Sequence, residues 1–148
     1  MIKSFRNQYF FLSNFYDLER NHGFSITLNG HDCRTSEHAY QMMKFKDKGI
    51  IREIVNAKNA GQAKGLARKY KDKVRDGWHE KKVEIMRQIL EVKFSNNNLK
   101  ELLINTGSDD LVEGNTHGDT FWGVVGTTGK NHLGNLLMEI RFKLATNG

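Results

Sequence analysis

The sequence predicts a mainly α (α+β) fold: one compact multihelical domain over residues 1–148 with a small N-terminal β-hairpin. Three observations predict this class. Apolar residues recur at helical spacing along much of the chain, and one segment carries a hairpin signal. A length of 148 residues is enough to bury one core and leaves no room for a second domain.

The hairpin is predicted near the N-terminus, after an aromatic and irregular segment from Phe5 to Tyr16. Phe24 to Leu28 alternates apolar and polar residues, and Asn29-Gly30 follows directly. This dipeptide favours the positive φ angles of a tight two-residue turn. The sequence has no proline, so glycine and asparagine must separate its other elements as well.

Helices are predicted for most of the remaining chain. Ser36 can cap a helix from Glu37 to Lys48, because its hydroxyl can accept a hydrogen bond from a free backbone N–H. The other predicted helices run from Ile50 to Ala57, from an Asn59 cap to about Tyr70, from His79 to Phe94, from Leu99 to a stop at Gly107, and onward from about Asn131. Short extended pieces are expected around Phe121 to Val125.

Two of these helices carry apolar stripes. The helix at 79–94 has apolar residues at spacings of three, four and four: Val83, Met86, Leu90 and Phe94. The last helix has a similar set: Leu133, Leu137, Ile140 and Leu144. Such spacing places the side chains on one face of a helix, so we expect both sets to be buried.

Composition narrows the class of protein. Hydrophobic residues make up 38% and charged residues 27%, as in ordinary globular proteins. Cys33 is the only cysteine, which excludes an internal disulfide and a cysteine-rich zinc site. The sequence contains no signal peptide and no apolar run long enough to cross a membrane, so we expect a cytoplasmic protein without a membrane partner.

The net charge of +6 favours an anionic partner, either a small phosphorylated ligand or nucleic acid. A basic run fits a nucleic-acid footprint or a solvated helix face: Lys64, Arg68, Lys69, Lys71, Lys73 and Arg75. The six histidines are scattered without paired metal spacing, so no metal site is predicted.

One segment, Thr35 to Lys44, combines side chains that suit catalysis. On a helix, Glu37, Gln41 and Lys44 share one face over two turns. They would supply an acid/base, a hydrogen-bonding group and a nucleophilic amine beside the helix N-terminus. The same spacing also fits a solvated stripe.

Two glycine-rich segments near the C-terminus are further candidates. In the first, Asp119 precedes Trp122, whose ring either stacks on a flat base or belongs to the core. The second, Gly126 to Gly134, enters a helix, where free backbone amides favour phosphate. It does not match a nucleotide-triphosphatase P-loop, because its glycine spacing is too short and Asn131 follows Lys130.

Several segments together resemble the NADAR (YbiA-like) family. The opening motif is similar at Phe11-Leu12-Ser13-Asn14-Phe15-Tyr16 and the central one at Ser36 to Gln41 with Lys44. Further similar pieces follow in the family's order: Lys93-Phe94, Thr106-Gly107, Leu111-Val112-Glu113, Asp119, Trp122-Gly123, Gly129, Asn131, Leu133-Gly134, Leu137-Met138 and Arg141. The family usually has a proline where this chain has Asp17.

The resemblance implies an N-glycosidase that needs neither metal nor cofactor. Its substrate would be phosphorylated and contain ribose: ADP-ribose attached to guanine in nucleic acid, or a ribosylamino-pyrimidine intermediate of riboflavin synthesis. A binding module for ADP-ribose or a nucleotide, without turnover, is the alternative from another class. An intact pair of Glu37 and Lys44 favours the enzyme.

By the same resemblance, Lys44 attacks the anomeric carbon and forms a Schiff base, Glu37 manages protons, and Asp119 belongs to the catalytic set. The implied substrate-binding residues are Asn14, Phe15, Tyr40, Gln41, Trp78, Trp122, Gly123, Lys130, Asn131 and Gly134. A lysine has an ordinary pKa of about 10.4 and is then a poor nucleophile. We therefore expect Lys44 to be desolvated, or Glu37 to be protonated when the amine attacks.

Overall fold

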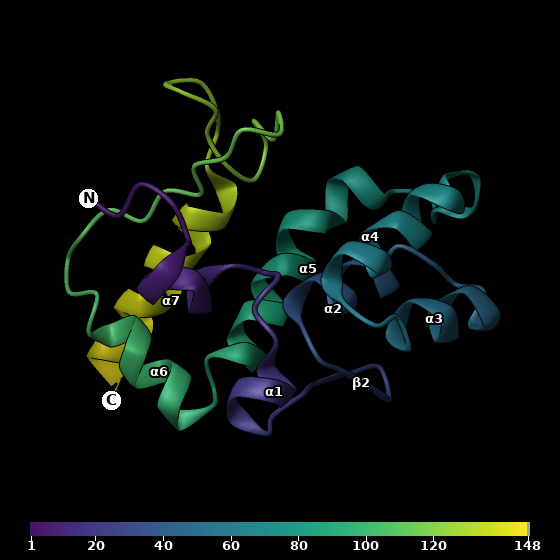
Figure 1. Ribbon diagram of the computed structural model, residues 1–148, viewed down its shortest axis with the longest axis horizontal. Helices are drawn as coiled ribbons and strands as arrows, with labels where there is room; N and C mark the ends of the chain where they lie inside the picture. The colour runs from purple at the N-terminus through teal and green to yellow at the C-terminus, as the bar shows by residue number, and fades with distance from the viewer. Residues whose placement is uncertain (148) are drawn as a thin grey trace. The chain divides into compact units, whose positions relative to one another are not determined.

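The computed structural model describes residues 1–147, which form two compact units (Figure 1). The central unit is Asn14–Lys93, and the terminal unit combines Met1–Ser13 with Phe94–Gly148. Both units consist mainly of helices, and the sheet content of the described residues is one two-stranded hairpin. The predicted fold class is confirmed.

The central unit is built around helix α2. Its elements in chain order are α1 (Leu18–His22), β1 (Ile26–Leu28), β2 (His31–Cys33), α2 (Ser36–Met42), α3 (Lys48–Val55), α4 (Ala60–Lys69), the 3₁₀-helix η2 (Lys71–Lys73) and α5 (Trp78–Lys93). Helix α2 packs against α3, α4 and α5 and also against both strands. Every residue of α2 is buried, including its polar ones.

The hairpin forms where the sequence predicts it. Strands β1 and β2 pair antiparallel, with Ile26 opposite Cys33 and Leu28 opposite His31. Asn29 and Gly30 form the turn with φ angles of 51° and 80°. Two consecutive positive φ angles define the turn type that matches the twist of a hairpin, and asparagine and glycine adopt them at least cost.

Helix α2 is shorter than predicted, and its cap differs. The predicted helix continued to Lys48 with Ser36 as its cap, whereas α2 ends at Met42 and Thr35 is the cap, accepting a hydrogen bond from the His38 backbone N–H. Asp47 then caps α3 by accepting hydrogen bonds from the next two free N–H groups. This second cap competes with continuation of the first helix, because it fixes an extended backbone at Asp47.

The short helix α1 is absent from the prediction. Asp17 caps it by accepting a hydrogen bond from the Arg20 N–H, and Gly23 ends it with a φ of 58°. The Asp17 carboxylate also pairs with the Arg34 guanidinium at 2.9 Å. A five-residue helix is too short to show helical periodicity, so only the cap could have predicted it.

The terminal unit contains the 3₁₀-helix η1 (Asn7–Leu12), α6 (Asn97–Ile104) and α7 (His132–Asn147). Helices α6 and α7 pack side by side (Figure 1). In α7, Leu133, Leu137 and Ile140 are buried as expected, whereas Leu144 is half-buried. The loops from 105 to 131 are held by isolated β-bridges, including one between Gly114 and Val124.

Buried His38 anchors helix α2 to the segment that follows α3. Its Nε2 lies 3.0 Å from the Ala57 carbonyl oxygen, and its Nδ1 lies 2.7 Å from the Thr35 hydroxyl. A carbonyl only accepts, so Nε2 carries the proton and Nδ1 accepts from Thr35. Burial holds the pKa of His38 below its ordinary value, although the hydrogen bond to Ala57 opposes the shift.

We therefore expect acid to destabilise the central unit through His38. The unfolded histidine binds a proton below about pH 6.5, while the folded one stays neutral to lower pH. The free energy of unfolding should fall as pH drops below that point, by at most about 1.4 kcal/mol per pH unit. Urea unfolding at pH 7.5 and 5.5 measures this loss of stability. The loss should be smaller in His38→Gln. It should be unchanged in the control His79→Gln, because His79 is exposed. An equal loss in His38→Gln and the native protein would contradict this assignment.

Candidate active site

The candidate site of the central unit begins at a buried carboxylate. Glu37 lies in the first turn of α2, and its backbone N–H donates to the Asn14 carbonyl at 3.0 Å. One turn later, the Gln41 side-chain amide donates from Nε2 to Glu37 Oε2 at 2.6 Å. Both side chains are buried, so the carboxylate is held in one orientation by a neutral donor.

Lys44 lies in the turn after α2 rather than within the helix. Its backbone N–H still donates to the Gln41 carbonyl, so the helical path is nearly maintained. The Lys44 carbonyl accepts from the Arg75 N–H at 2.8 Å, which ties this turn to the segment before α5. The amine Nζ lies 5.2 Å from the centre of the Tyr40 ring, within the range of a cation–π contact.

The environment of Lys44 lowers the pKa of its amine. Desolvation is the main cause, and the positive charges of Lys82 and Lys64 act in the same direction. The Glu37 carboxylate raises the pKa and only partly offsets these effects. The expected desolvation of Lys44 is thus present. More of the amine is neutral, and therefore nucleophilic, near neutral pH than for a lysine in water.

Aromatic rings surround the amine on one side. Trp78 is buried at the start of α5, and its ring centre lies 5.3 Å from that of Tyr40. The Lys44 amine thus contacts the Tyr40 ring, which in turn contacts the Trp78 ring. Phe15, also predicted to bind substrate, is 41% exposed.

Several buried polar atoms of the central unit have no hydrogen-bond partner among residues 1–147. They are Asn14 Oδ1, Ser36 Oγ, Gln41 Oε1 and Arg75 Nε. Such atoms are rare in proteins, and a ligand is one of the partners that satisfies them. From the sequence, Ser36 is expected as a helix cap and part of the central motif and Arg75 as part of a basic run, and neither is predicted to bind substrate.

The remaining predicted residues lie in the terminal unit. Asp119 shapes a turn, because its Oδ1 accepts from the backbone N–H groups of Phe121 at 3.1 Å and Trp122 at 2.9 Å. The half-buried Trp122 ring meets Phe121 edge-on, with the ring centres 4.9 Å apart. This turn fixes where the indole lies.

Four of the backbone amides that were expected to hold a phosphate before α7 have hydrogen-bond partners within the protein. The backbone N–H groups of residues 130–133 all donate within the unit, to the carbonyls of Thr120, Gly123, Phe121 and Trp122. These four N–H groups are therefore not free for an anion, and a phosphate contact elsewhere in the loop from Gly126 to Gly134 stays a prediction. The Lys130 side chain is exposed, and its Nζ lies 6.0 Å from the Phe121 ring centre.

Asn131, Gly123 and Gly134 hold the same loops together. The Asn131 side chain accepts from the Glu113 N–H at 3.0 Å and donates to the Leu111 carbonyl at 2.9 Å. A Cβ atom at Gly134 would lie 2.0 Å from the Leu111 oxygen, and one at Gly123 would lie 2.1 Å from the Glu113 oxygen. These positions require glycine for close packing, which is a structural role the sequence analysis did not predict.

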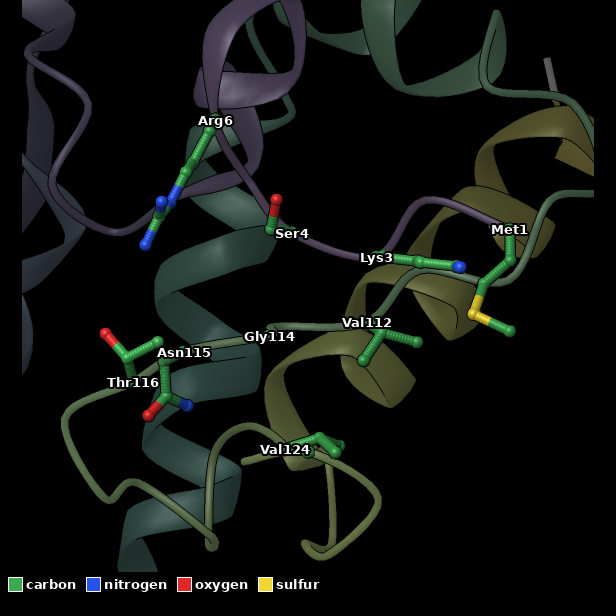
Figure 2. A pocket seen from close by; sticks show the side chains of 10 residues that line it. Met1, Lys3, Ser4, Arg6, Val112, Gly114, Asn115, Thr116 and Val124 are labelled. Atoms are coloured by element: carbon green, nitrogen blue, oxygen red, sulfur yellow. The ribbon is translucent and has the colours of Figure 1, made fainter.

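The terminal unit also has an open hollow of about 520 Å³, shown in Figure 2. It runs between the N-terminal segment and the loops at 112–126, and it is lined by Met1, Lys3, Ser4, Arg6, Val112, Gly114, Asn115, Thr116, Val124 and Gly126. Lys3 and Arg6 make this lining basic. Of the candidate sites predicted from the sequence, only the loop from Gly126 to Gly134 contributes a lining residue, Gly126.

The described residues contain neither a metal-binding cluster of side chains nor a helix able to span a membrane. Residues 1–147 contain no group of three or more His, Cys, Asp or Glu side chains placed to hold a metal ion. Within the same residues, no helix has the length and apolar character needed to span a membrane.

Comparisons with known proteins give a consistent result. A family model described as the NADAR domain matches residues 2–145. The N-glycosidase YbiA of Shigella flexneri serotype 5b (strain 8401) is 37% identical over 141 residues, covering 89% of this chain and 88% of that protein. The NMR structure of Escherichia coli YbiA matches with a TM-score of 0.81 and 34% identity, over 99% of this chain and 88% of that one.

A second kind of relative is longer. The riboflavin biosynthesis protein VVA0006 of Vibrio vulnificus (strain YJ016) is 40% identical over 139 residues, which make up 88% of this chain. The matched part is 38% of the length of the Vibrio protein.

Proposed function

The chain belongs to the NADAR family, and on that basis we propose that it is an N-glycosidase acting on a phosphorylated, ribose-containing substrate. The substrate we favour is ADP-ribose attached to guanine in nucleic acid, whose base-to-ribose bond would be hydrolysed. One arrangement carries the proposal: Gln41 is hydrogen-bonded to the buried Glu37 through its side chain and to Lys44, whose amine is desolvated, through its backbone carbonyl. The names of the YbiA relatives support the reaction class.

In the proposed reaction, a proton first passes from the Lys44 ammonium to the Glu37 carboxylate, which leaves a neutral amine and a protonated Glu37. The amine nitrogen attacks the anomeric carbon, the bond from that carbon to the base nitrogen breaks, and the base leaves with a proton supplied by Glu37. The sugar ring opens as the lysine nitrogen forms a Schiff base. Water then adds to the Schiff base, assisted by the Glu37 carboxylate, and releases the free sugar and the Lys44 amine.

The surroundings of the two groups suit these roles. Desolvation favours the neutral amine before attack, and Gln41 holds the Glu37 carboxyl group beside it. The tilted pair of Tyr40 and Trp78 offers an aromatic surface beside the reacting nitrogen. The family resemblance also implies a catalytic role for Asp119 and substrate contacts for Trp122 and Asn131.

A second substrate is favoured by a specific observation. The Vibrio relative is named a riboflavin biosynthesis protein, which supports a ribosylamino-pyrimidine intermediate as the substrate. The chemistry at Lys44 and Glu37 would be unchanged, since both substrates join a nitrogen to ribose. A module that only binds ADP-ribose would have no need for a desolvated lysine.

Product analysis tests this function. The protein is incubated with ADP-ribosylated guanine oligonucleotide and, separately, with the ribosylamino-pyrimidine phosphates, and released base is measured by chromatography. We expect base release from the first substrate. Release only from the pyrimidine would establish the second substrate, and binding of ADP-ribose without release from either would contradict the enzyme.

The phosphate contact proposed for Lys130 gives a smaller prediction. Because this side chain is exposed, Lys130→Ala should weaken substrate binding only about 2- to 5-fold at physiological salt. Titration calorimetry with ADP-ribose measures the effect, with Lys64→Ala compared in parallel. Unchanged binding by Lys130→Ala and weaker binding by Lys64→Ala would move the phosphate contact to the basic run at 64–75.

A further inference from the structure

The amino end of the Gln41 side-chain amide is hydrogen-bonded, whereas its carbonyl end is not. Gln41 is 4% exposed, and its Nε2 donates to the Glu37 carboxylate. A carboxylate only accepts, so the amino end of Gln41 must face Glu37 and the amide cannot be flipped. The carbonyl end, Oε1, is buried and accepts no hydrogen bond from any of the residues 1–147.

Two further buried oxygen atoms also lack a hydrogen-bond partner. Asn14 Oδ1 and Ser36 Oγ are buried and make no hydrogen bond within the described chain. Both residues adjoin Glu37, Ser36 as its neighbour in sequence and Asn14 through the bond from the Glu37 N–H to the Asn14 carbonyl. Three buried oxygens on Glu37's hydrogen-bond partners and its neighbour in sequence therefore lack a partner within the described chain. A buried acceptor left unpaired is costly, so a ligand with hydroxyl donors would be bound here with selectivity.

We propose that Gln41 Oε1 accepts a hydrogen bond from the ribose 2-hydroxyl, so that the site selects ribosyl over 2-deoxyribosyl N-glycosides. This inference rests on the proposed function, in which the Lys44 amine attacks the anomeric carbon and so fixes where that carbon lies. The 2-hydroxyl is attached to the carbon next to it. Gln41 is hydrogen-bonded to Glu37 through its side chain and to the Lys44 N–H through its backbone carbonyl, so we assign this hydroxyl to Gln41 Oε1.

The chemistry of the partner supports a sugar hydroxyl over a charged group. A hydroxyl donates one hydrogen bond and carries no charge, so it satisfies a neutral amide oxygen without a further charge beside Glu37 and Lys44. A 2-deoxy sugar has no donor at this carbon and leaves Oε1 buried and unpaired. Sites built around such a hydrogen bond discriminate strongly against ligands that lack the group.

A matched pair of ligands tests the proposal without turnover. Binding of ribose 5-phosphate and 2-deoxyribose 5-phosphate is measured by calorimetry on the native protein, Gln41→Met and the control Gln88→Met. Both sugars carry the same aldehyde carbon and phosphate, so any Schiff base contributes to both. Gln88 is exposed on α5, away from the proposed site, which makes it a matched substitution.

We expect the native protein to bind the ribose compound roughly 5- to 100-fold more tightly than the deoxy compound. Gln41→Met should weaken the binding of ribose 5-phosphate and leave the binding of the deoxy compound nearly unchanged. The ratio of the two affinities should then approach one. Gln88→Met should keep the native ratio. If Gln41 only held Glu37 in place, Gln41→Met would weaken both ligands equally and preserve the ratio.

Equal affinities in the native protein, no binding of either sugar phosphate, or a preserved ratio in Gln41→Met would each overturn the proposal. A thermal melt would reveal whether Gln41→Met folds. If it does not fold, the comparison of the two sugar phosphates on the native protein still tests the proposal. Selective binding of ribose 5-phosphate together with no base release in the product analysis would uphold the hydroxyl site and reject the glycosidase.

Discussion

Lys44→Arg is expected to abolish base release while substrate still binds. Arginine keeps the positive charge and approximate length, but its guanidinium does not lose a proton in proteins and so provides no nucleophile. The measurement is the rate of base release under single-turnover conditions, with substrate affinity measured separately by calorimetry. We expect no turnover above background and an affinity within a few-fold of the native protein.

Lys46→Arg is the matched control, because Lys46 is exposed and lies two residues further along the same loop. It should release base at the native rate. Native turnover by Lys44→Arg would rule out a covalent route through this amine, and Glu37 would then become the leading catalytic residue. Loss of both binding and turnover, with a lowered melting temperature, would indicate misfolding, and Lys44→Met would then be used instead.

Glu37→Gln is expected to slow base release by about 10² to 10⁴, the usual loss when a positioned acid/base is removed. The amide keeps the size of the side chain and can still accept from Gln41 Nε2, so the packing of α2 should survive. The kinetic measurement is kcat, because the lost proton transfer belongs to the chemical step rather than to binding.

The exposed Glu91 on α5 offers a control of the same chemical change. Glu91→Gln should have native kinetics. A Glu37→Gln protein with native kcat would show that another group transfers the proton, and Asp119 would be the next residue to substitute.

Local signals predicted most of the fold. The Asn29-Gly30 turn and the Asn59 cap of α4 depend on residues within a few positions of one another, and both form as expected. The end of α2 was predicted wrongly because its helical pattern continues past Met42 in sequence. Asp47 caps a new helix there. The spacing of apolar residues does not show that a second cap ends the first helix.

The candidate site was predicted in its residue types more than in its roles. Spacing correctly associated Glu37 with Gln41, which are joined by a hydrogen bond. Spacing could not show that Arg75 binds the Lys44 carbonyl, because the pair is far apart in sequence. The amides before α7 were expected to be free, yet they bond to carbonyls of the preceding loop, a tertiary pairing that a glycine-rich sequence does not reveal.

Borohydride trapping tests the central claim most directly. A Schiff base between the Lys44 nitrogen and the opened sugar is reduced to a stable amine, which adds a defined mass to the protein. We expect intact-mass spectrometry to show one sugar adduct, formed only with substrate and borohydride together, and peptide mapping to place it on Lys44. Efficient base release with no adduct, as in hydrolysis by a carboxylate-activated water, would contradict the mechanism proposed for this protein.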